Sequence, residues 1–536
     1  MEVTPGASFP PGAAPGSATS GPGAAGHTVK ADDPVAAAAE GAEATAVSPE
    51  LPAADAHRHG LADRFGFWLF LTTIVLAPIP DGSVAPLWIQ VWIITIGVAA
   101  LAISYRGLSR GAAAVLWGLV AILCCYGVVA WLQSISPGPS PLAVWSEASK
   151  VLGMDLAPFS SSVRNTPAIF LGRPLLAALV LTVSIAVGTH RRRAGLVLRA
   201  IVASATLYGF IGLIDLLFHI DQLRPYDQAG ALTTFFLNKN TSATYLGSAF
   251  LLVFAMLLPP ALAAVRERRP LATMFRGPDR RRRIAATAAG LFLLILLPLT
   301  LSRAGVMLTV FVALSALAMK LRLRKRAALW QLLLAVLVLF SLVYALSGES
   351  WRERHARLGF DTLGRLDAYQ EMLGAAVRHP LLGLGLGSFL QSFPQYRSED
   401  LGLYGHFNIG HSTPVELIFE GGFPLAFSVF AFSLSCLALL IRGAIRRPDD
   451  PYILAGLLVG LLGGIHTSFD FPLQIPGYTI TYLAVVGMAI GRSFLPREER
   501  KMVKKKVVRR PVGPGPEAAV GDDGSAPDLP PAPATG

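Results

Sequence analysis

Residues 111–132 read GAAAVLWGLVAILCCYGVVAWL, an apolar run without a charged side chain. A helix needs about 20 mostly apolar residues to cross the hydrocarbon core of a bilayer, so this run predicts a membrane span. Comparable runs recur along the chain and predict about twelve spans in all. The others lie near residues 65–80, 84–103, 174–189, 196–218, 240–264, 284–301, 303–319, 327–347, 412–441, 452–469 and 475–494. The expected fold is therefore an all-α polytopic integral membrane protein.

The composition of the chain agrees with this fold class. Of 536 residues, 53% are apolar and 15% are charged, whereas a soluble domain carries roughly 25% charged residues. A net charge of +12 would suggest a nucleic-acid partner in a soluble protein. Here the basic residues fall in loops between predicted spans, as topology signals do, so the expected surroundings are membrane lipids and not nucleic acid.

Lys and Arg also predict the orientation of the chain. Alternate loops lie on opposite sides of the membrane, and most Lys and Arg fall in the set that lies on the same side as the amino terminus. Basic residues favour the cytoplasmic side, so the sequence predicts an even number of spans with both termini inside. Residues 1–60 are rich in Ala, Gly and Pro and predict a disordered cytoplasmic tail. Residues 497–536, first basic and then similar in composition, predict a second tail, which leaves 61–496 as the membrane domain.

Two predicted outer loops are long, at about 133–173 and about 348–411, and the second is the large loop between spans nine and ten. Within it, apolar residues recur at helical spacing over residues 365–378. This pattern predicts an amphipathic helix that lies on the membrane surface and ends before Pro380. Loops of this length are often functional.

Most histidines, together with several arginines, map to the outer face or to the ends of spans that reach it. A single arginine there could simply reach the lipid phosphates. A cluster on a face that disfavours basic residues instead indicates a functional site. Four segments carry these polar residues, with a fifth close by. They are residues 238–245, 302–305, 364–389 and 411–422, followed by 466–476.

The individual motifs have simple alternative explanations. The amides of Asn238 and Asn240 could bind sugar hydroxyls or could cap a helix. The GLGLG sequence at 383–387 is not a dinucleotide fingerprint, because no βαβ unit surrounds it. Glu416 and Glu420 share one helical face and could form helix–helix hydrogen bonds instead of taking part in chemistry.

The order of these segments resembles the O-antigen ligase and polymerase superfamily of bacterial membrane glycosyltransferases. The resemblance covers roughly residues 230–480 and includes SRAG at the start of a span and an arginine before the amphipathic helix. It continues with HPLLGLGLGSF at 379–389 and a histidine at the mouth of a later span. The sequence departs from the family pattern at Ser412, where asparagine is usual.

The resemblance implies an enzyme in the inner (plasma) membrane of a bacterium, with the large outer loop periplasmic. It would transfer glycan from an undecaprenyl-diphosphate carrier to an acceptor hydroxyl on the periplasmic face. The acceptor is the lipid A core of lipopolysaccharide in a ligase and another carrier-linked glycan in a polymerase. Arg303 and Arg365 would bind the diphosphate, since guanidinium groups suit phosphate oxygens. His411 would be the catalytic base, with Glu416 or the second catalytic residue, Glu420, orienting it. Further glycan-binding or supporting residues are expected at Asn240, His379, Glu416, His466 and Asp470.

No cofactor or metal is expected, because the predicted outer face lacks the paired carboxylates that Mg²⁺ needs. The family implies a single-step, inverting transfer. Ligase is slightly favoured over polymerase of O-antigen or exopolysaccharide. A lipid-linked glycan flippase or a transporter is the alternative from another class, for which Asp215 is the main charge within a span. A scaffold without chemistry would leave the arginine cluster unexplained.

Overall fold

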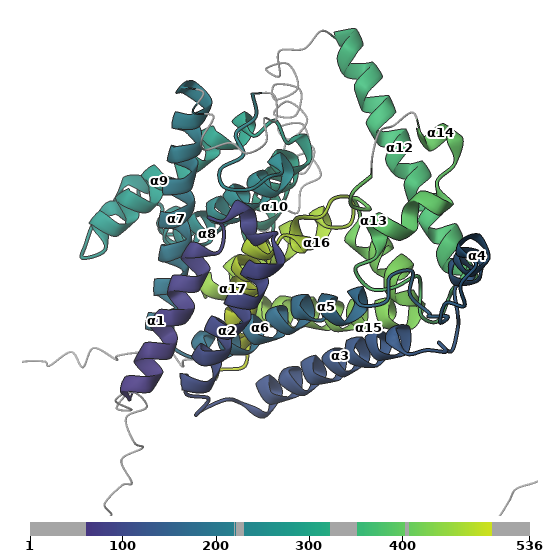
Figure 1. Cartoon of the computed structure of the whole chain (residues 1–536). Helices are drawn as coiled ribbons and strands as arrows, with labels where there is room; N and C mark the ends of the chain where they lie inside the picture. The colour runs from purple at the N-terminus through teal and green to yellow at the C-terminus, as the bar shows by residue number, and fades with distance from the viewer. Residues whose placement is uncertain (1–59, 219, 221–229, 322–350, 403–406, 496–536) are drawn as a thin grey trace, which may run out of the picture. The chain divides into compact units, whose positions relative to one another are not determined.

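The computed structural model describes residues 60–218, 220, 230–321, 351–402 and 407–495, and all regular elements within these ranges are helices (Figure 1). The predicted tails and the predicted span at 327–347 lie outside the described residues. Helices occupy the positions of the other predicted spans. They are α1 (Leu61–Leu76), α2 (Pro86–Ala102), α3 (Arg110–Ser134), α6 (Gly172–Gly188), α7 (Arg191–Phe218), α8 (Lys239–Arg266), α9 (Arg280–Leu299), α10 (Arg303–Leu321), α15 (Thr413–Arg446), α16 (Pro451–His466) and α17 (Pro476–Ser493).

Seven helical stretches of the described chain are long and apolar enough to cross a membrane. They are Arg110–Ser134, Thr166–Gly188, Arg191–Phe218, Lys239–Arg266, Arg280–Leu299, Arg303–Leu321 and Thr413–Arg446. Pro86–Ala102 and Pro451–His466 are shorter apolar helices. The polytopic helical fold is therefore supported, while the total of twelve spans and the sidedness of the loops stay predictions.

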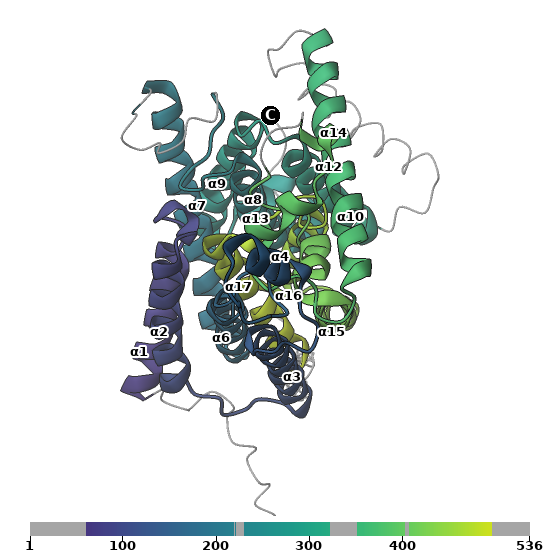
Figure 2. The same ribbon diagram turned by 45° about the vertical axis from the view of Figure 1, so that its right-hand side comes forward.

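Helix α17 packs along α6 at the centre of the helical bundle (Figure 2). Small residues permit this close approach, as they do between membrane helices in general. A Cβ atom on Gly188 would collide with the backbone carbonyl of Met488, and one on Gly491 would collide with that of Ile185. A large side chain at either position would force the two helices apart.

The turn between α9 and α10 is tight. Leu301 has a left-handed φ of 52°, and the hydroxyl of Ser302 accepts a hydrogen bond from the amide of Gly305 at 3.2 Å. Gly305 lies against Ala243 near the start of α8, where a Cβ atom would be 2.5 Å from the Ala243 Cβ. This packing places Arg303, the first residue of α10, beside the first turns of α8.

The short helices α4 (Ala143–Leu152) and α13 (Phe389–Ser392) gather with the long helix α12 (Trp351–Arg378) at one end of α3 and α15 (Figure 1). Ala368 and Met372 of α12 and Phe389 of α13 form one buried apolar cluster with Leu142, just before α4, and Phe419 of α15. The other short elements are α5 (Thr166–Phe170), α14 (Glu399–Gly402) and the 3-10 helices η1 (Asp81–Ser83), η3 (Leu271–Phe275), η4 (Phe393–Tyr396) and η5 (Pro472–Gln474).

Residues 365–378 are helical within α12, and the helix ends before Pro380, as predicted. Ala368 and Met372 are buried, whereas Leu366, Leu373 and Val377 expose 49%, 37% and 67% of their surface. This exposed apolar face is compatible with a membrane surface, and contact with the membrane stays a prediction.

Helix α15 is broken at Gly422, which has φ 78° and ψ 170°. Residues 383–387 pack into this break. The amides of Leu384 and Gly385 donate to the carbonyls of Phe419 and Glu420, at 2.9 and 3.0 Å. Gly383 and Gly385 have positive φ angles, and a Cβ atom on either would clash with the surrounding chain. The repeated glycines therefore serve close backbone packing.

Candidate functional site

His411 directly precedes the capping residue of α15, and its backbone is held from three sides. Its φ angle is 52°, in a region that only a few per cent of non-glycine residues occupy. Its carbonyl accepts a hydrogen bond from the hydroxyl of Tyr369 at 2.7 Å. The amide of Gly410 donates to Glu416 Oε2 at 2.8 Å, and the amide of Thr413 donates to the carbonyl of Thr467 at 3.1 Å. An unusual backbone conformation held this firmly suggests function.

The imidazole of His411 is half-buried between aromatic rings. The Phe471 and Phe407 rings contact it edge-on, with centroid distances of 5.3 and 6.1 Å. Its Nδ1 atom is buried and has no hydrogen-bond partner among the described residues. Burial, and to a smaller extent the cation of Arg365, lowers the pKa of His411 to about 4. The ring is therefore neutral at physiological pH and able to accept a proton.

Arg365, on α12, supplies the cation at the centre of the site. Its Nη1 atom donates to the carbonyl of Phe469 at 3.3 Å. The guanidinium lies within electrostatic reach of His411, His466 and Asp470. The structure thus brings together three predicted site residues, from two segments that are distant in sequence, around one arginine.

Asn240 and Asp470 join the first turn of α8 to the segment after α16. The Asn240 side-chain amide donates to Asp470 Oδ2, and the amide of Phe471 donates to Asp470 Oδ1 at 2.8 Å. Burial raises the pKa of Asp470, and the neighbouring amides and Arg365 oppose that rise. Asn238 caps the helix, because its side chain accepts hydrogen bonds from the amides of Asn240 and Thr241. The side chain of Asn240 instead binds Asp470.

His466 is fully buried, and the donors and acceptors around its Nδ1 atom indicate its tautomer. Thr244 Oγ1 donates to the carbonyl of Asn240 at 2.7 Å and lies 2.7 Å from His466 Nδ1. A hydroxyl has a single proton, so Thr244 accepts from a protonated Nδ1. The Nε2 atom of His466 is then unprotonated, and it has no hydrogen-bond partner among the described side chains and backbone. His466 thus presents an acceptor close to Arg365.

Arg303 lies at the same end of the bundle, on a different helix. It begins α10, directly after the tight turn, and α10 packs on α8 next to the residues that hold Asp470. Arg303 and Arg365 therefore approach the first turns of α8 from two helices that are separate in sequence.

The two predicted orienting carboxylates of α15 have different partners. Glu416 Oε2 accepts from the amide of Gly410 and, at 3.1 Å, from the side chain of Gln474. Glu420 instead accepts from the amides of Gly387 and Phe389, the latter at 2.8 Å. The hypothesis that Glu420 orients His411 does not match this geometry, because its carboxylate binds the glycine-rich loop. Glu416 contacts the residue next to His411.

His379 lies apart from the cluster around Arg365. It follows the last residue of α12, and thirteen helical residues correspond to about 20 Å along the axis. Its carbonyl accepts from the amide of Gly383 at 2.9 Å, so it helps to shape the start of the glycine-rich loop. Its predicted role as a glycan-binding residue gains no support from these contacts.

Gln133 at the end of α3 was not predicted from the sequence, and it anchors the same loop. Its Nε2 atom donates to the carbonyls of Leu382 and Glu420, at 2.5 and 2.9 Å, and its Oε1 atom accepts from the amide of Leu386 at 3.0 Å. A buried glutamine near the end of an otherwise apolar span was the available signal, since such a residue needs partners. Tyr369 and Gln474 were also missed, because neither type is unusual at its position.

Within the described ranges, no group of three or more His, Cys, Asp or Glu side chains is arranged to hold a metal ion. Arginines are the cations that the site itself supplies.

Residues 288–430 match the family model described as O-antigen ligase. This segment includes Arg303, Arg365, His411, Glu416 and Glu420, while Asn240, His466 and Asp470 lie outside it. No curated protein matches the chain.

Proposed function

The chain belongs to the O-antigen ligase and polymerase superfamily, and from this premise we propose that it transfers glycan from an undecaprenyl-diphosphate carrier to an acceptor hydroxyl. The transfer takes place at the extracytoplasmic face of the membrane. The observation that supports it most strongly is the convergence of Arg365, His411 and Asp470. This convergence puts the cation of Arg365 within electrostatic reach of the neutral imidazole of His411.

Arg303 and Arg365 bind the diphosphate in this proposal. Negative charge grows on the phosphate oxygens as the bond from the diphosphate to the sugar breaks. Fixed cations that face such charge usually make the largest contribution to catalysis. The carbonyl of Phe469 accepts a hydrogen bond from Arg365, and Asp470 lies within electrostatic reach of its guanidinium. The proposed reaction therefore needs no metal.

His411 accepts the proton of the acceptor hydroxyl. The acceptor oxygen forms its bond to the anomeric carbon, the bond to the diphosphate breaks, and the lipid diphosphate leaves with the electron pair. Attack opposite the leaving group inverts the anomeric centre. Glu416 positions His411 through Gly410, and Glu420 holds the glycine-rich loop. We propose ligase activity, with the lipid A core as acceptor, and O-antigen or exopolysaccharide polymerase activity as the second candidate.

Complementation of a deletion strain tests the proposal. Arg303→Ala, Arg365→Ala and His411→Ala are expressed at matched membrane abundance, and surface glycan is read by gel. Arg378→Ala is the matched control for Arg365→Ala, since Arg378 lies on the same helix and stacks on Tyr396. We expect the three site variants to fail and the control to restore glycan.

The carrier-linked glycan that accumulates separates the candidates. Full-length carrier-linked glycan indicates a ligase, and single repeat units indicate a polymerase. Wild-type surface glycan from all three site variants contradicts the proposed site. A flippase or transporter, with Asp215 within α7 as its charged residue, would then be favoured.

A further inference from the structure

Helix α12 carries two side chains that bind the backbone around the candidate site. Arg365 and Tyr369 are four residues apart, a spacing that places side chains next to each other along a helix. The Arg365 guanidinium donates to the carbonyl of Phe469 at 3.3 Å, and the Tyr369 hydroxyl donates to the carbonyl of His411 at 2.7 Å. One helix thus binds both the segment after α16 and the segment before α15.

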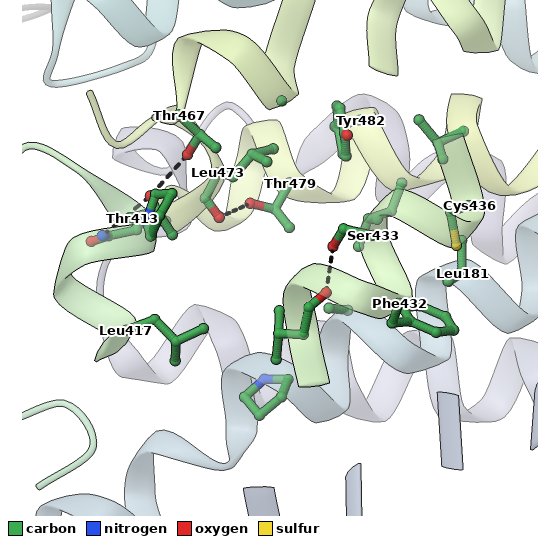
Figure 3. A pocket seen from close by; sticks show the side chains of 18 of the residues that line it. Leu181, Thr413, Leu417, Phe432, Ser433, Cys436, Thr467, Leu473, Thr479 and Tyr482 are labelled. Carbon is green, nitrogen blue, oxygen red and sulfur yellow. Dashed lines mark hydrogen bonds between the residues drawn. The ribbon is translucent and has the colours of Figure 1, made fainter. Parts of the chain in front are cut away.

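The bond from α12 acts on His411 itself, whereas other bonds of the segment hold its neighbours. The amide of Gly410 donates to Glu416, and the amide of Thr413 donates to the carbonyl of Thr467. The side chains of Thr413 and Thr467 also form a hydrogen bond at 2.8 Å, and both line a cavity of about 840 Å³ (Figure 3). These partners belong to α15 and to the residue directly after α16, so α12 holds the segment from a separate element.

The backbone conformation of His411 makes such a bond important. Its φ angle of 52° is left-handed, and a non-glycine residue stays in this region when the surrounding structure holds it there. The directions of the carbonyl and of the imidazole both depend on the backbone angles of the residue. A bond that fixes the carbonyl of His411 therefore also limits where its ring points.

The hydroxyl of Tyr369 stays a hydrogen-bond donor at physiological pH. Burial raises the pKa of Tyr369 to about 12, while Arg365 opposes that rise and Asp470 adds to it. A phenol with this pKa keeps its proton near neutral pH. The hydroxyl therefore lies within electrostatic reach of the proposed cation, and it is bonded to the residue that carries the proposed base.

We propose that Tyr369 is a positioning residue that links the backbone of His411 to the helix that carries Arg365. This inference rests on the proposed function and adds a residue to its site. Arg365 and the hydroxyl of Tyr369 move with α12, so the base and the cation reach their working positions together. A displacement of α12 would misplace both.

The hydroxyl can be removed without removing the contacts that hold α12. Ala368, Met372 and Ala375 of this helix are buried in the apolar cluster shared with α13 and α15. The ring of Tyr369 packs against the same cluster and is only half-buried. Tyr369→Phe keeps the ring and removes the donor, so it tests the bond to His411 separately from the packing of α12.

Tyr396→Phe is the matched control. Tyr396 also packs against this apolar cluster and is half-buried. Its ring contacts Phe419 edge-on and lies beside the guanidinium of Arg378, at centroid distances of 6.1 and 5.2 Å. The control therefore removes one tyrosine hydroxyl from the same cluster and leaves the bond to the His411 carbonyl intact.

Steady-state kinetics on the purified full-length protein measure the effect on transfer. We expect Tyr369→Phe to lower kcat about tenfold, since it leaves the carbonyl of His411 without its donor. The KM for the lipid-linked donor should stay close to the wild-type value, because Arg365 is still in place. Tyr396→Phe should match wild type in both constants. An equal loss of kcat in the two variants would assign the effect to packing and overturn the proposal.

The His411→Ala background tests whether Tyr369 acts through the imidazole. A residue that works by placing His411 has no ring to place in this background, and the effects of coupled residues are not additive. We expect Tyr369→Phe to lower the residual transfer of His411→Ala by less than about twofold. A further tenfold loss would mean that Tyr369 acts through another group, which contradicts the proposal.

Hydrogen exchange measured by mass spectrometry separates this inference from the proposed function, because it requires no transfer. We expect the amides of residues 410–413 to exchange faster in Tyr369→Phe than in wild type or Tyr396→Phe. If His411→Ala transfers normally while this segment exchanges faster, the proposed base fails and the link from α12 to His411 stands. If His411→Ala loses transfer but Tyr369→Phe matches wild type in exchange and rate, the proposed function stands and the inference fails.

Discussion

Glu416 and Glu420 lie one turn apart on α15, yet they belong to regions with opposite characters. In residues 410–416, hydrogen bonds fix the backbone, while the buried Nδ1 atom of His411 has no partner within the described structure. In the glycine-rich loop at 382–389, Glu420 and Gln133 satisfy the backbone groups that packing has buried.

The difference separates the functions of two neighbouring carboxylates that the sequence pattern could not distinguish. A buried polar network with all its partners present stabilises one conformation. A side chain that is held firmly but has an unused polar atom is instead available to a ligand. We therefore expect changes near His411 to reduce catalysis and changes near Gln133 to reduce stability.

The largest effect is expected at His411. His411→Ala should reduce transfer by about 10²–10⁴-fold, the usual contribution of a general base. Since the pKa of His411 is lowered to about 4, the neutral base predominates above that pH and is lost as the pH falls through it. Transfer by the wild type, measured with purified protein, should thus be level near neutral pH and fall toward pH 4. A steep loss near pH 6.5, the ordinary histidine value, would contradict this environment.

A somewhat smaller effect is expected at Arg365. Arg365→Ala should lower the rate of transfer about 10²–10³-fold, since it removes a fixed donor that faces developing charge. Arg365→Lys should recover only part of the rate, because a lysine cannot bind two phosphate oxygens in the same geometry. Steady-state kinetics on purified protein measure both. A lysine variant as active as wild type would show that charge alone suffices.

Hydropathy predicted the positions of the described apolar helices because bilayer thickness and helical rise determine how long an apolar run must be. The end of α12 before Pro380 and the turn before Arg303 also followed from local pattern. Contacts between distant segments could not be predicted from local pattern. Gln133 binds a loop about 250 residues later in the chain, and no local pattern indicates that pairing. The separate partners of Glu416 and Glu420 depend on how the glycine-rich loop enters the break in α15.

An intermediate effect is expected at Glu416. Glu416→Leu removes the acceptor for the Gly410 amide, so we expect a roughly tenfold loss of the maximal rate from the misplaced His411. Glu416→Gln keeps an oxygen that can accept from Gly410 and should stay close to wild type. Comparison of kcat and KM for the two variants measures this. If Gln is as defective as Leu, the negative charge itself is required, and a role confined to holding the backbone is wrong.

The smallest catalytic effect and a clear loss of stability are expected at Gln133. Gln133→Leu leaves the amide of Leu386 and the carbonyls of Leu382 and Glu420 without this partner, which should lower the free energy of unfolding by about 1–3 kcal/mol. Gln391→Leu is the control, since Gln391 is exposed on α13. Thermal unfolding in detergent should show a lower Tm for Gln133→Leu alone, with transfer per folded molecule unchanged. A normal Tm combined with a large loss of transfer would instead place the glycine-rich loop in the catalytic site, and the contrast between the two regions would not hold.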